Sequence, residues 1–230
     1  MSIRRDELID QIVASQQNRV SFDLDKIDEE YKLFSVMLSD EGWYLDYDLA
    51  VETLSSLYIK QVKTESNVLD KYMVDFYKKK LNIIINFFQK EFPKRYLILE
   101  KAFKAHKKGD FELSIPVFLS QIEGLFFDLT NKEIFSKGRG KRKENTAKEW
   151  LEEREGHDVN LILSILEPLR KNENISANIK DSENFPNALN RNKILHGRDL
   201  NYSIEINSYK SISLLLFIGT IVYDTINELK

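Results

Sequence analysis

The sequence predicts an all-α protein built as a helical bundle, on the strength of three observations. Apolar residues recur at three- and four-residue steps over most of the chain, which is the period of an α-helix. Glycine and proline number only 8 and 4 in 230 residues. Tight turns are therefore few, which disfavours an all-β fold and a glycine-rich nucleotide-binding fold. No stretch alternates apolar and polar residues over a length that requires a sheet.

Three helices are predicted in the first part of the chain. Apolar spacing places them at 24–39, 47–62 and 66–91. The third ends at Phe92-Pro93, because the residue before a proline is pushed out of the helical region. An aromatic cluster between the first two helices is expected to anchor the core; its members are Trp43, Tyr44 and Tyr47.

Three longer helices are predicted after this break. Pro93 begins a helix that stops at Gly109, with His106 in its last turn, where the helix dipole favours a cation. A helix over 112–130 follows. The last helix, 205–229, is apolar around much of its circumference, which places it in the centre of the bundle. Two stretches, 136–146 and 172–184, are expected to be irregular.

The break at Phe92 divides the predicted protein into an N-terminal helical region, 1–91, and a functional half, 93–230. Charge is unevenly distributed between them. Residues 1–62 hold 13 acidic and 6 basic residues, whereas 71–108 hold 11 basic and 3 acidic ones, and 132–148 hold 7 and 2. Such blocks indicate pairing within the chain, a polyanion site on the basic part, or solvated helix faces.

Composition also excludes several kinds of site. The chain has no cysteine, so disulfide scaffolds, thiolate zinc sites and cysteine nucleophiles are excluded. With three histidines in all, we expect no metal and no cofactor. The start of the chain has no apolar signal segment, and its longest apolar run, at 212–223, is shorter than the roughly 20 residues of a membrane span. We therefore expect a soluble cytoplasmic protein with no membrane contact.

The chemically informative segment contains Arg191, Asn192 and His196. A short helix over 187–196 would put Asn192 and His196 one turn apart on one face, and Gly197 would end it. Histidine titrates near neutrality, and arginine offers a fork of donors to phosphate oxygens. RNA supplies its own nucleophile, the 2′-hydroxyl. A base for that proton and a cation on the phosphate could therefore cleave RNA without a metal, with Asn192 orienting His196 or the phosphate.

This segment resembles the Arg-x4–6-His signature of the HEPN superfamily (higher eukaryotes and prokaryotes nucleotide-binding), and the wider pattern resembles a bacterial branch of it. In that signature the arginine is commonly followed by Asn, Asp or His. The resemblance covers about 100–217. It is carried by Ala105-His106-Lys-x-Gly109-x-Phe111-x-Leu-Ser-Ile-Pro116, by Gln121-Ile-Glu-Gly124 and by Asn190-Arg-Asn-x-x-Leu-His-Gly197.

The resemblance implies a helical-bundle core, homodimers whose two motifs face each other, and metal-independent RNA cleavage in many members. Such proteins often act in toxin–antitoxin, phage-defence or RNA-processing systems, which implies an antitoxin or defence-system partner. The expected function is therefore a HEPN-type endoribonuclease acting on RNA. Some members have lost catalysis and only bind, so the alternative is a non-catalytic helical module that binds RNA or a protein.

Several further residues have two interpretations. Glu123, within an apolar helix, either holds Arg191 or His196 or lies at the surface boundary. Arg198 either contacts a second phosphate or pairs with Asp199. Several toxin members of the superfamily carry a tyrosine two residues after the histidine; here that position is Arg198, and Tyr202 is the nearest tyrosine.

A basic loop precedes the motif-bearing segment, and it either tracks an RNA backbone or is a solvated linker. Its cations are Lys137, Arg139, Lys141, Arg142 and Lys143.

Overall fold

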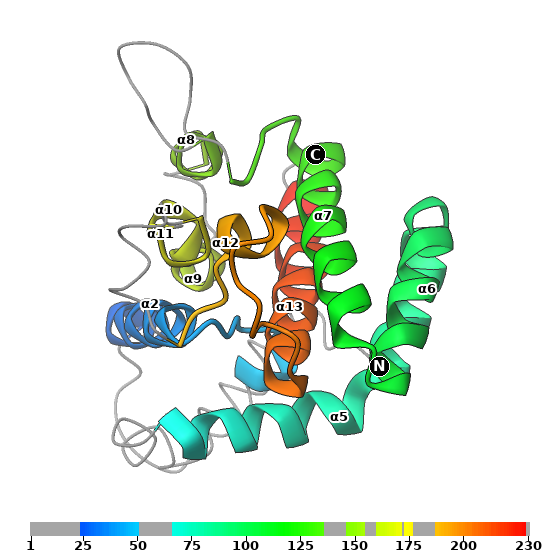
Figure 1. Cartoon of the computed structure of the whole chain (residues 1–230). Coiled ribbons are helices and arrows are strands. Elements are labelled where there is room, and N and C mark those ends of the chain that lie inside the picture. The colour runs from blue at the N-terminus through cyan, green and yellow to red at the C-terminus, as the bar shows by residue number, and fades with distance from the viewer. Residues whose placement is uncertain are drawn as a thin grey trace.

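The structure, a computed structural model, describes residues 24–50, 66–135, 146–154, 160–171, 173–176 and 187–228. Every regular element in these ranges is a helix, and no strand occurs among them (Figure 1). The predicted all-α bundle is confirmed.

Twelve helical elements have their bounds within the described ranges, in addition to the helical residues 47–50. Their bounds are α2 Leu24–Asp40, α5 Ser66–Glu91, α6 Pro93–Lys108, α7 Phe111–Thr130, α8 Thr146–Glu152, α9 Asn160–Ile165, α10 Pro168–Lys171, α11 Glu173–Ser176, α12 Arg191–Leu195, α13 Glu205–Phe217, the π-helix η2 Ile218–Val222, and α14 Tyr223–Glu228.

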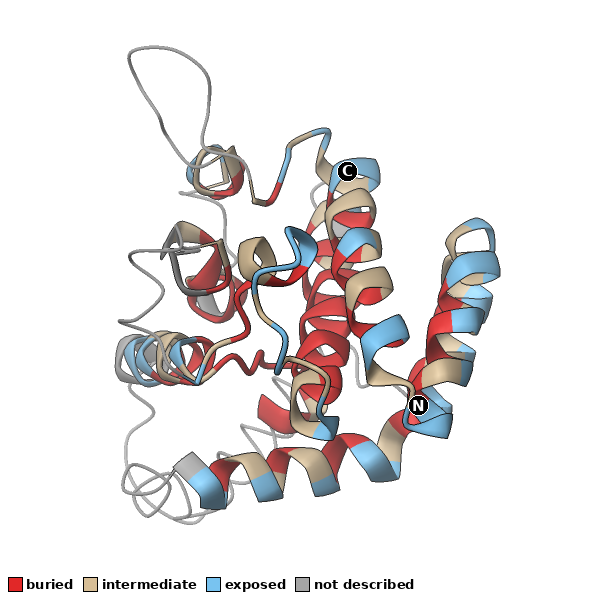
Figure 2. Ribbon diagram, viewed as in Figure 1, coloured by how far each residue is buried: buried red, intermediate tan, exposed pale blue. Residues whose placement is uncertain are grey.

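The C-terminal helical stretch forms the centre of the bundle, as its apolar circumference predicts. Every residue from Ser208 to Val222 is buried (Figure 2). Helix α13 packs against α7 on one side and α5 on another, and α6 packs against both α5 and α7. Because this helix contacts neighbours around its whole circumference, it has no solvent face that would need polar residues.

The end of α5 and both ends of α6 lie where the proline and glycine in the sequence predict them. Helix α5 ends at Glu91 and α6 begins with Pro93 as its first residue. Gly109 ends α6 in the left-handed conformation at φ 83°. The aromatic cluster at 43–47 is buried, and one hydrophobic core contains residues from both sides of the Phe92 break. The division into two units at that point stays a prediction.

The last helix and the stretch 172–184 differ from the prediction. The last helix is interrupted by a π-helical turn at Ile218–Val222. The stretch 172–184, expected to be irregular, contains the short helix α11, and its residues 177–184 lie outside the described ranges. Residues 47–50 are helical as expected, whereas 51–62 lie outside the described ranges.

The π-helical turn lies where two phenylalanines of α5 approach it. A Cβ added to Gly219 would lie 2.8 Å from Phe88 Cε1 and 3.3 Å from Phe87 Cε1. No other residue fits here without moving the Phe88 ring, which is fully buried. The glycine thus allows α5 to cross close to the central helix.

Two helical stretches are long and apolar enough to cross a membrane by length and composition alone. They are α7 and Glu205–Asn227, and the second is 83% buried inside the protein over its most apolar window. Such burial is typical of the core helix of a soluble protein. The cytoplasmic location stays a prediction.

Candidate functional site

The site is built on α12, a single short turn of helix. It begins at Arg191 rather than at 187, because the Asn190 side chain caps it by accepting a hydrogen bond from the Lys193 N–H at 2.8 Å. His196 is the C-terminal cap, and its N–H donates to the Asn192 carbonyl at 3.2 Å. Gly197 follows at φ 66°, a left-handed conformation that glycine adopts without strain. Asn192 and His196 are therefore one turn apart, as predicted.

Arg191 reaches from α12 to α7. Its Nη2 donates to Glu123 Oε2 at 2.5 Å, and its Nη1 donates to Asn192 Oδ1 at 3.3 Å. The guanidinium carbon lies 5.3 Å from the centre of the Phe135 ring, a cation–π distance. The side chain is 23% exposed and that of Glu123 30%. Of the interpretations of Glu123, the structure contains the ion pair with Arg191.

The guanidinium retains donors after these contacts. Arginine carries five N–H groups, and two of them are used. The Nε is buried with no hydrogen-bond partner among the described residues. The other two N–H groups, on the Nη atoms, have no protein acceptor within the same ranges. Arg191 is thus fixed at one edge and can still accept a further anion at another.

Helix α7 presents the residues around Glu123 to a second arginine. Arg95 of α6 donates to the Gln121 side chain at 3.1 Å and to the Gly124 carbonyl, and it pairs with Asp128 at 2.7 Å. A Cβ on Gly124 would lie 2.5 Å from Arg95 Nη1. The Gln-Ile-Glu-Gly sequence therefore contacts two neighbouring helices. Gln121 and Gly124 face α6, and Glu123 faces α12.

Asn192 connects the site to a different helix. Its Nδ2 donates to the Ser176 carbonyl at the end of α11 at 3.0 Å, while its Oδ1 accepts from Arg191. The amide side chain is thus oriented by two partners. This fixes Asn192 as a spacer between Arg191 and α11, with no hydrogen bond to His196 among those of the described chain.

His196 is exposed, and its imidazole makes no side-chain hydrogen bond or ion pair within the described ranges. It lies at the opposite end of α12 from Arg191. Five residues of helix rise about 7.5 Å and turn by about 140°. The imidazole is therefore available to a ligand, and the long Arg191 side chain must extend along the turn for both to reach one phosphodiester.

A hollow at the turn that follows α12 carries two cations. It is lined by Lys193, Arg198, Asp199, Leu200 and Asn201. The turn at Gly197 folds the chain back, so that the Arg198 N–H donates to the Lys193 carbonyl at 2.8 Å. Asp199 Oδ1 accepts from the Asn201 N–H, and no ion pair joins it to Arg198 within the described part of the chain. Sequence reasoning did not include Lys193, which its place one turn before Gly197 could have revealed.

The Tyr202 side chain is hydrogen bonded within the protein. Its hydroxyl donates to the Glu112 carbonyl at 3.1 Å, and the neighbouring Ser203 hydroxyl donates to the Glu112 carboxylate at 2.9 Å. These contacts fasten the link between α12 and α13 to the first turn of α7. A part for Tyr202 in the chemistry stays a prediction.

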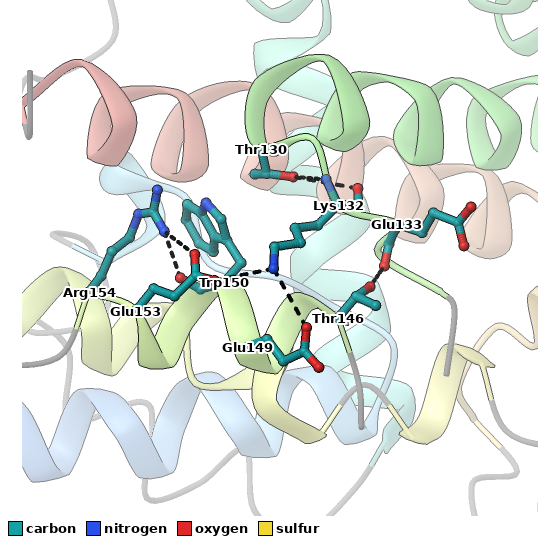
Figure 3. Close-up of polar contacts among 8 residues, drawn as sticks. All are labelled: Thr130, Lys132, Glu133, Thr146, Glu149, Trp150, Glu153 and Arg154. Atoms are coloured by element: carbon teal, nitrogen blue, oxygen red, sulfur yellow. Dashed lines mark hydrogen bonds and ion pairs between the residues drawn. The ribbon is translucent and has the colours of Figure 1, made fainter. Parts of the chain in front are cut away.

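The basic loop with Lys137, Arg139, Lys141, Arg142 and Lys143 lies outside the described residues, but both of its flanks are described. Lys132 pairs with Glu153 at 3.2 Å and with Glu149 at 3.6 Å, and Thr146 donates to the Glu133 carbonyl (Figure 3). These contacts tie the start of α8 to the end of α7. Phe135, which directly precedes the loop, is the ring that faces Arg191.

His106 lies in the last turn of α6 as expected, but it is not the exposed cation that the dipole argument implies. It is 5% exposed, its ring packs edge-on to Tyr209, and its Nδ1 hydrogen bonds to Ser208 Oγ at 2.7 Å. Burial lowers the pKa of His106 to about 4, so the ring is neutral at pH 7. Desolvation therefore outweighs the helix dipole. Ser114 Oγ completes the cluster, 3.2 Å from Ser208 Oγ.

A second polar cluster, which sequence reasoning missed, lies between the N-terminal segment and the π-helix. Asp46 is 3% exposed and lines a small cavity with Lys80 and Thr220. Its Oδ1 accepts from the Leu49 N–H, and its Oδ2 has no hydrogen-bond partner among the described residues. Burial raises the pKa of Asp46 to about 6, against the opposing charge of Lys80 at 3.8 Å. No group of three or more potential metal ligands occurs within the described ranges.

Comparisons with protein-family models, with curated proteins and with solved structures give no match to this chain. The proposed function therefore rests on the geometry of the site.

Proposed function

We propose that the protein is a metal-independent endoribonuclease of the HEPN type, with its site at α12. His196 moves the proton of the RNA 2′-hydroxyl or of the leaving 5′-oxygen. Arg191 binds the scissile phosphate through its unused Nη donors, and Asn192 positions it. The 2′-oxygen forms a bond to phosphorus as the bond to the 5′-oxygen breaks. The products are a 2′,3′-cyclic phosphate and a 5′-hydroxyl end.

The observation that carries the proposal is the pairing of a fixed guanidinium with an unoccupied imidazole on one turn. Glu123 fixes Arg191 while leaving it N–H donors for phosphate oxygens. His196 has no protein partner in the described ranges, and it is exposed. The exposed imidazole is open to a ligand, unlike that of His106, which is buried and hydrogen bonded to Ser208. The anchored arginine lies at the other end of the same helical turn.

The cationic surroundings extend the site. Lys193 and Arg198 flank the hollow at the turn that follows α12, where they would contact neighbouring phosphates of the same strand. Phe135, which directly precedes the basic loop, faces Arg191, which supports an RNA-binding role for the loop's five cations.

The alternative function, a non-catalytic module that binds RNA or a protein, is favoured by a different observation. The Glu123 carboxylate neutralises Arg191, and about three quarters of the Arg191 side chain is covered. A neutralised arginine attracts phosphate less than a free one does. Under this alternative Arg191 holds α12 in place, and the exposed Lys193–Asn201 surface binds the partner.

The proposal includes a homodimer in the cytoplasm. Three large apolar side chains near His196 are exposed, which supports a protein contact at this face: Leu195, Leu200 and Ile204, at 37%, 85% and 47%. A second copy seated there would bring two motifs together. An antitoxin or another defence-system protein would use the same face. Sedimentation of the purified chain tests the dimer.

Two RNA substrates separate the functions. The purified protein is incubated with an end-labelled RNA in EDTA and with the same sequence carrying 2′-O-methyl groups throughout. The nuclease cleaves only the first and leaves 2′,3′-cyclic phosphate ends. An RNA-binding module retains both RNAs intact on a filter, and a protein that neither cleaves nor retains RNA contradicts the nuclease and leaves only the protein-binding form of the alternative.

A further inference from the structure

The segment that delivers Arg191 to the site, residues 187–190, is held by parts of the chain far from it in sequence. Lys210 of α13 donates from its Nζ to the Asn187 carbonyl at 2.7 Å. The Asn187 side chain donates to Glu41 Oε2 at 2.9 Å. Leu189 and Asn190 are buried, at 4% and 7% exposure. The segment is thus clamped between the end of α2 and the central helix before it caps α12.

Lys210 is an unusual residue for the centre of an apolar helix. It is 3% exposed, and its ammonium pairs with Asp70 of α5 at 3.2 Å. The Trp43 Nε1 donates to the same Asp70 oxygen at 2.7 Å, and the ammonium lies 5.6 Å from the centre of the Trp43 ring. Burial lowers the pKa of Lys210, with Asp70 opposing that shift. A buried lysine costs free energy unless its ammonium is paired, and here Asp70 and the Asn187 carbonyl supply the partners.

Gly42 brings the turn after α2 against the same segment. It adopts φ 84°, and a Cβ there would lie 3.1 Å from Lys210 Cδ, 3.3 Å from Ala188 Cα and 3.4 Å from Leu189 N. The turn therefore touches both the lysine stem and the backbone of the segment. Only a residue without a side chain fits this approach without displacement.

We propose that Lys210 and the turn at Gly42 position the 187–190 segment, and through it Arg191 and His196. The N-terminal region thus helps to set the geometry of the site. The catalytic consequence rests on the proposed nuclease function, whereas the positioning itself does not. Neither residue touches the substrate; both act through the Asn190 cap that starts α12.

Amide hydrogen exchange tests the positioning without any RNA. The reporters are the Lys193 and Ile194 amides, which donate to the Asn190 side chain and carbonyl. Lys210→Met keeps the aliphatic stem and removes both the hydrogen bond to Asn187 and the ion pair with Asp70. It is expected to speed exchange at these two amides about tenfold more than at the α7 amides, the effect of the lost hydrogen bond, while the loss of global stability from the unpaired Asp70 speeds exchange at both places alike. Thr225→Val is the control, since this buried hydroxyl of α14 donates to the Ile221 carbonyl one turn earlier, in η2, and to no other residue that the structure describes.

A second pair of variants keeps the test decisive if Lys210→Met does not fold. Gly42→Ala and Gly109→Ala impose the same backbone strain, at φ 84° and 83°, but a Cβ at Gly109 has nothing within 4 Å. Faster exchange at Lys193 and Ile194 in Gly42→Ala alone supports the proposal, and equal exchange in both glycine variants overturns it.

Kinetics then separate positioning from the nuclease itself. In a cleaving protein, Gly42→Ala is expected to lower kcat with little change in KM, because the RNA contacts remain while the alignment is disturbed. A fall in kcat no larger than that of Gly109→Ala contradicts the proposal. If the wild-type chain cleaves no RNA, the nuclease function fails while the exchange result still stands.

Discussion

Arg191 and Glu123, 68 positions apart, form an ion pair of 2.5 Å between the first residue of α12 and the middle of α7. The pair has two effects. It fixes the helical turn that carries His196, and it sets how much positive charge Arg191 offers to a ligand. The nuclease and the binding module differ in which of these effects matters.

Glu123→Gln is expected to destabilise the protein by about 1 kcal/mol, because a partly buried ion pair loses one charge. RNA cleavage is expected to fall as well, since an uncharged hydrogen bond holds Arg191 to α7 less firmly than the ion pair does. Urea unfolding and initial cleavage rates measure the two effects. Asp128→Asn is the control, because it weakens the Arg95 pair on the same helix without touching Arg191. Equal cleavage by Glu123→Gln and wild type would argue against any orienting role for Glu123.

Two buried groups give opposite dependences of stability on pH. The folded-state pKa of His106 is lowered to about 4, so its contribution is present above the unfolded pKa near 6.5 and is lost as pH falls from about 6.5 to 4. The folded-state pKa of Asp46 is raised to about 6, so its contribution is present below the unfolded pKa near 3.9 and is lost as pH rises to 6. Between pH 4 and 6 the two contributions cancel.

Asp46→Asn is therefore expected to expose the contribution of His106. Relative to wild type, its unfolding free energy should rise by about 1.4 kcal/mol per pH unit between pH 4 and 6. His106→Gln should change by a similar amount in the other direction. Urea unfolding at half-unit steps of pH measures both slopes. Parallel profiles for wild type and Asp46→Asn would mean that Asp46 is ionised over this range in the folded state.

Gly219→Ala is expected to cost about 1–3 kcal/mol, because the new methyl group meets the Phe88 ring at 2.8 Å. The double variant with Phe88→Leu should lose less than the sum of the two single changes, since the smaller side chain leaves room for the methyl group. Thermal unfolding of the four proteins gives the coupling. If the destabilisations of the two single variants add exactly in the double variant, the π-helical turn does not contact Phe88.

Neutralising the basic loop at Lys137, Arg139, Lys141, Arg142 and Lys143 is expected to weaken RNA binding and to flatten its salt dependence. Every cation that no longer neutralises a phosphate reduces the slope of log affinity against log salt by about 0.7 for a single strand. Filter binding at several salt concentrations measures the slope. An unchanged slope identifies the loop as a linker that leaves RNA untouched.

Local signals in the sequence predict much of this fold. The Phe92-Pro93 break ends α5, and Gly109 ends α6. Each of these residues sets the conformation of its own stretch of backbone. The apolar circumference of 205–229 places α13 in the centre because burial follows composition. These features depend on neighbours in sequence, so one chain is sufficient to reveal them.

Features that depend on distant contacts were not predictable in the same way. The π-helical turn exists where Phe88 of α5 crosses Gly219. The late start of α12 is different, because the Asn190 cap that sets it is a local signal. The partners of Lys210, Asp70 and Asn187, follow only from the packing of three segments.

For the candidate site too, local geometry was predictable from the sequence and contacts between distant residues were not. The spacing of Arg191, Asn192 and His196 gives their placement on one turn, since helical geometry fixes it. Which partner Glu123 takes could not be derived, because α7 presents adjacent residues to two different helices. His106 was placed correctly but assigned a charge, since its burial depends on Tyr209 and Ser208 from α13.

The most direct test of the account is RNA cleavage by His196→Ala, with Lys101→Ala, an exposed cation on α6, as the control. The imidazole is exposed and has no protein partner in the described ranges, so its removal should leave stability unchanged within about 0.5 kcal/mol. Loss of a general acid or base lowers the rate by about 10²–10⁴-fold. The account predicts a folded His196→Ala that leaves RNA intact beside an active control. Equal cleavage by both variants would contradict it.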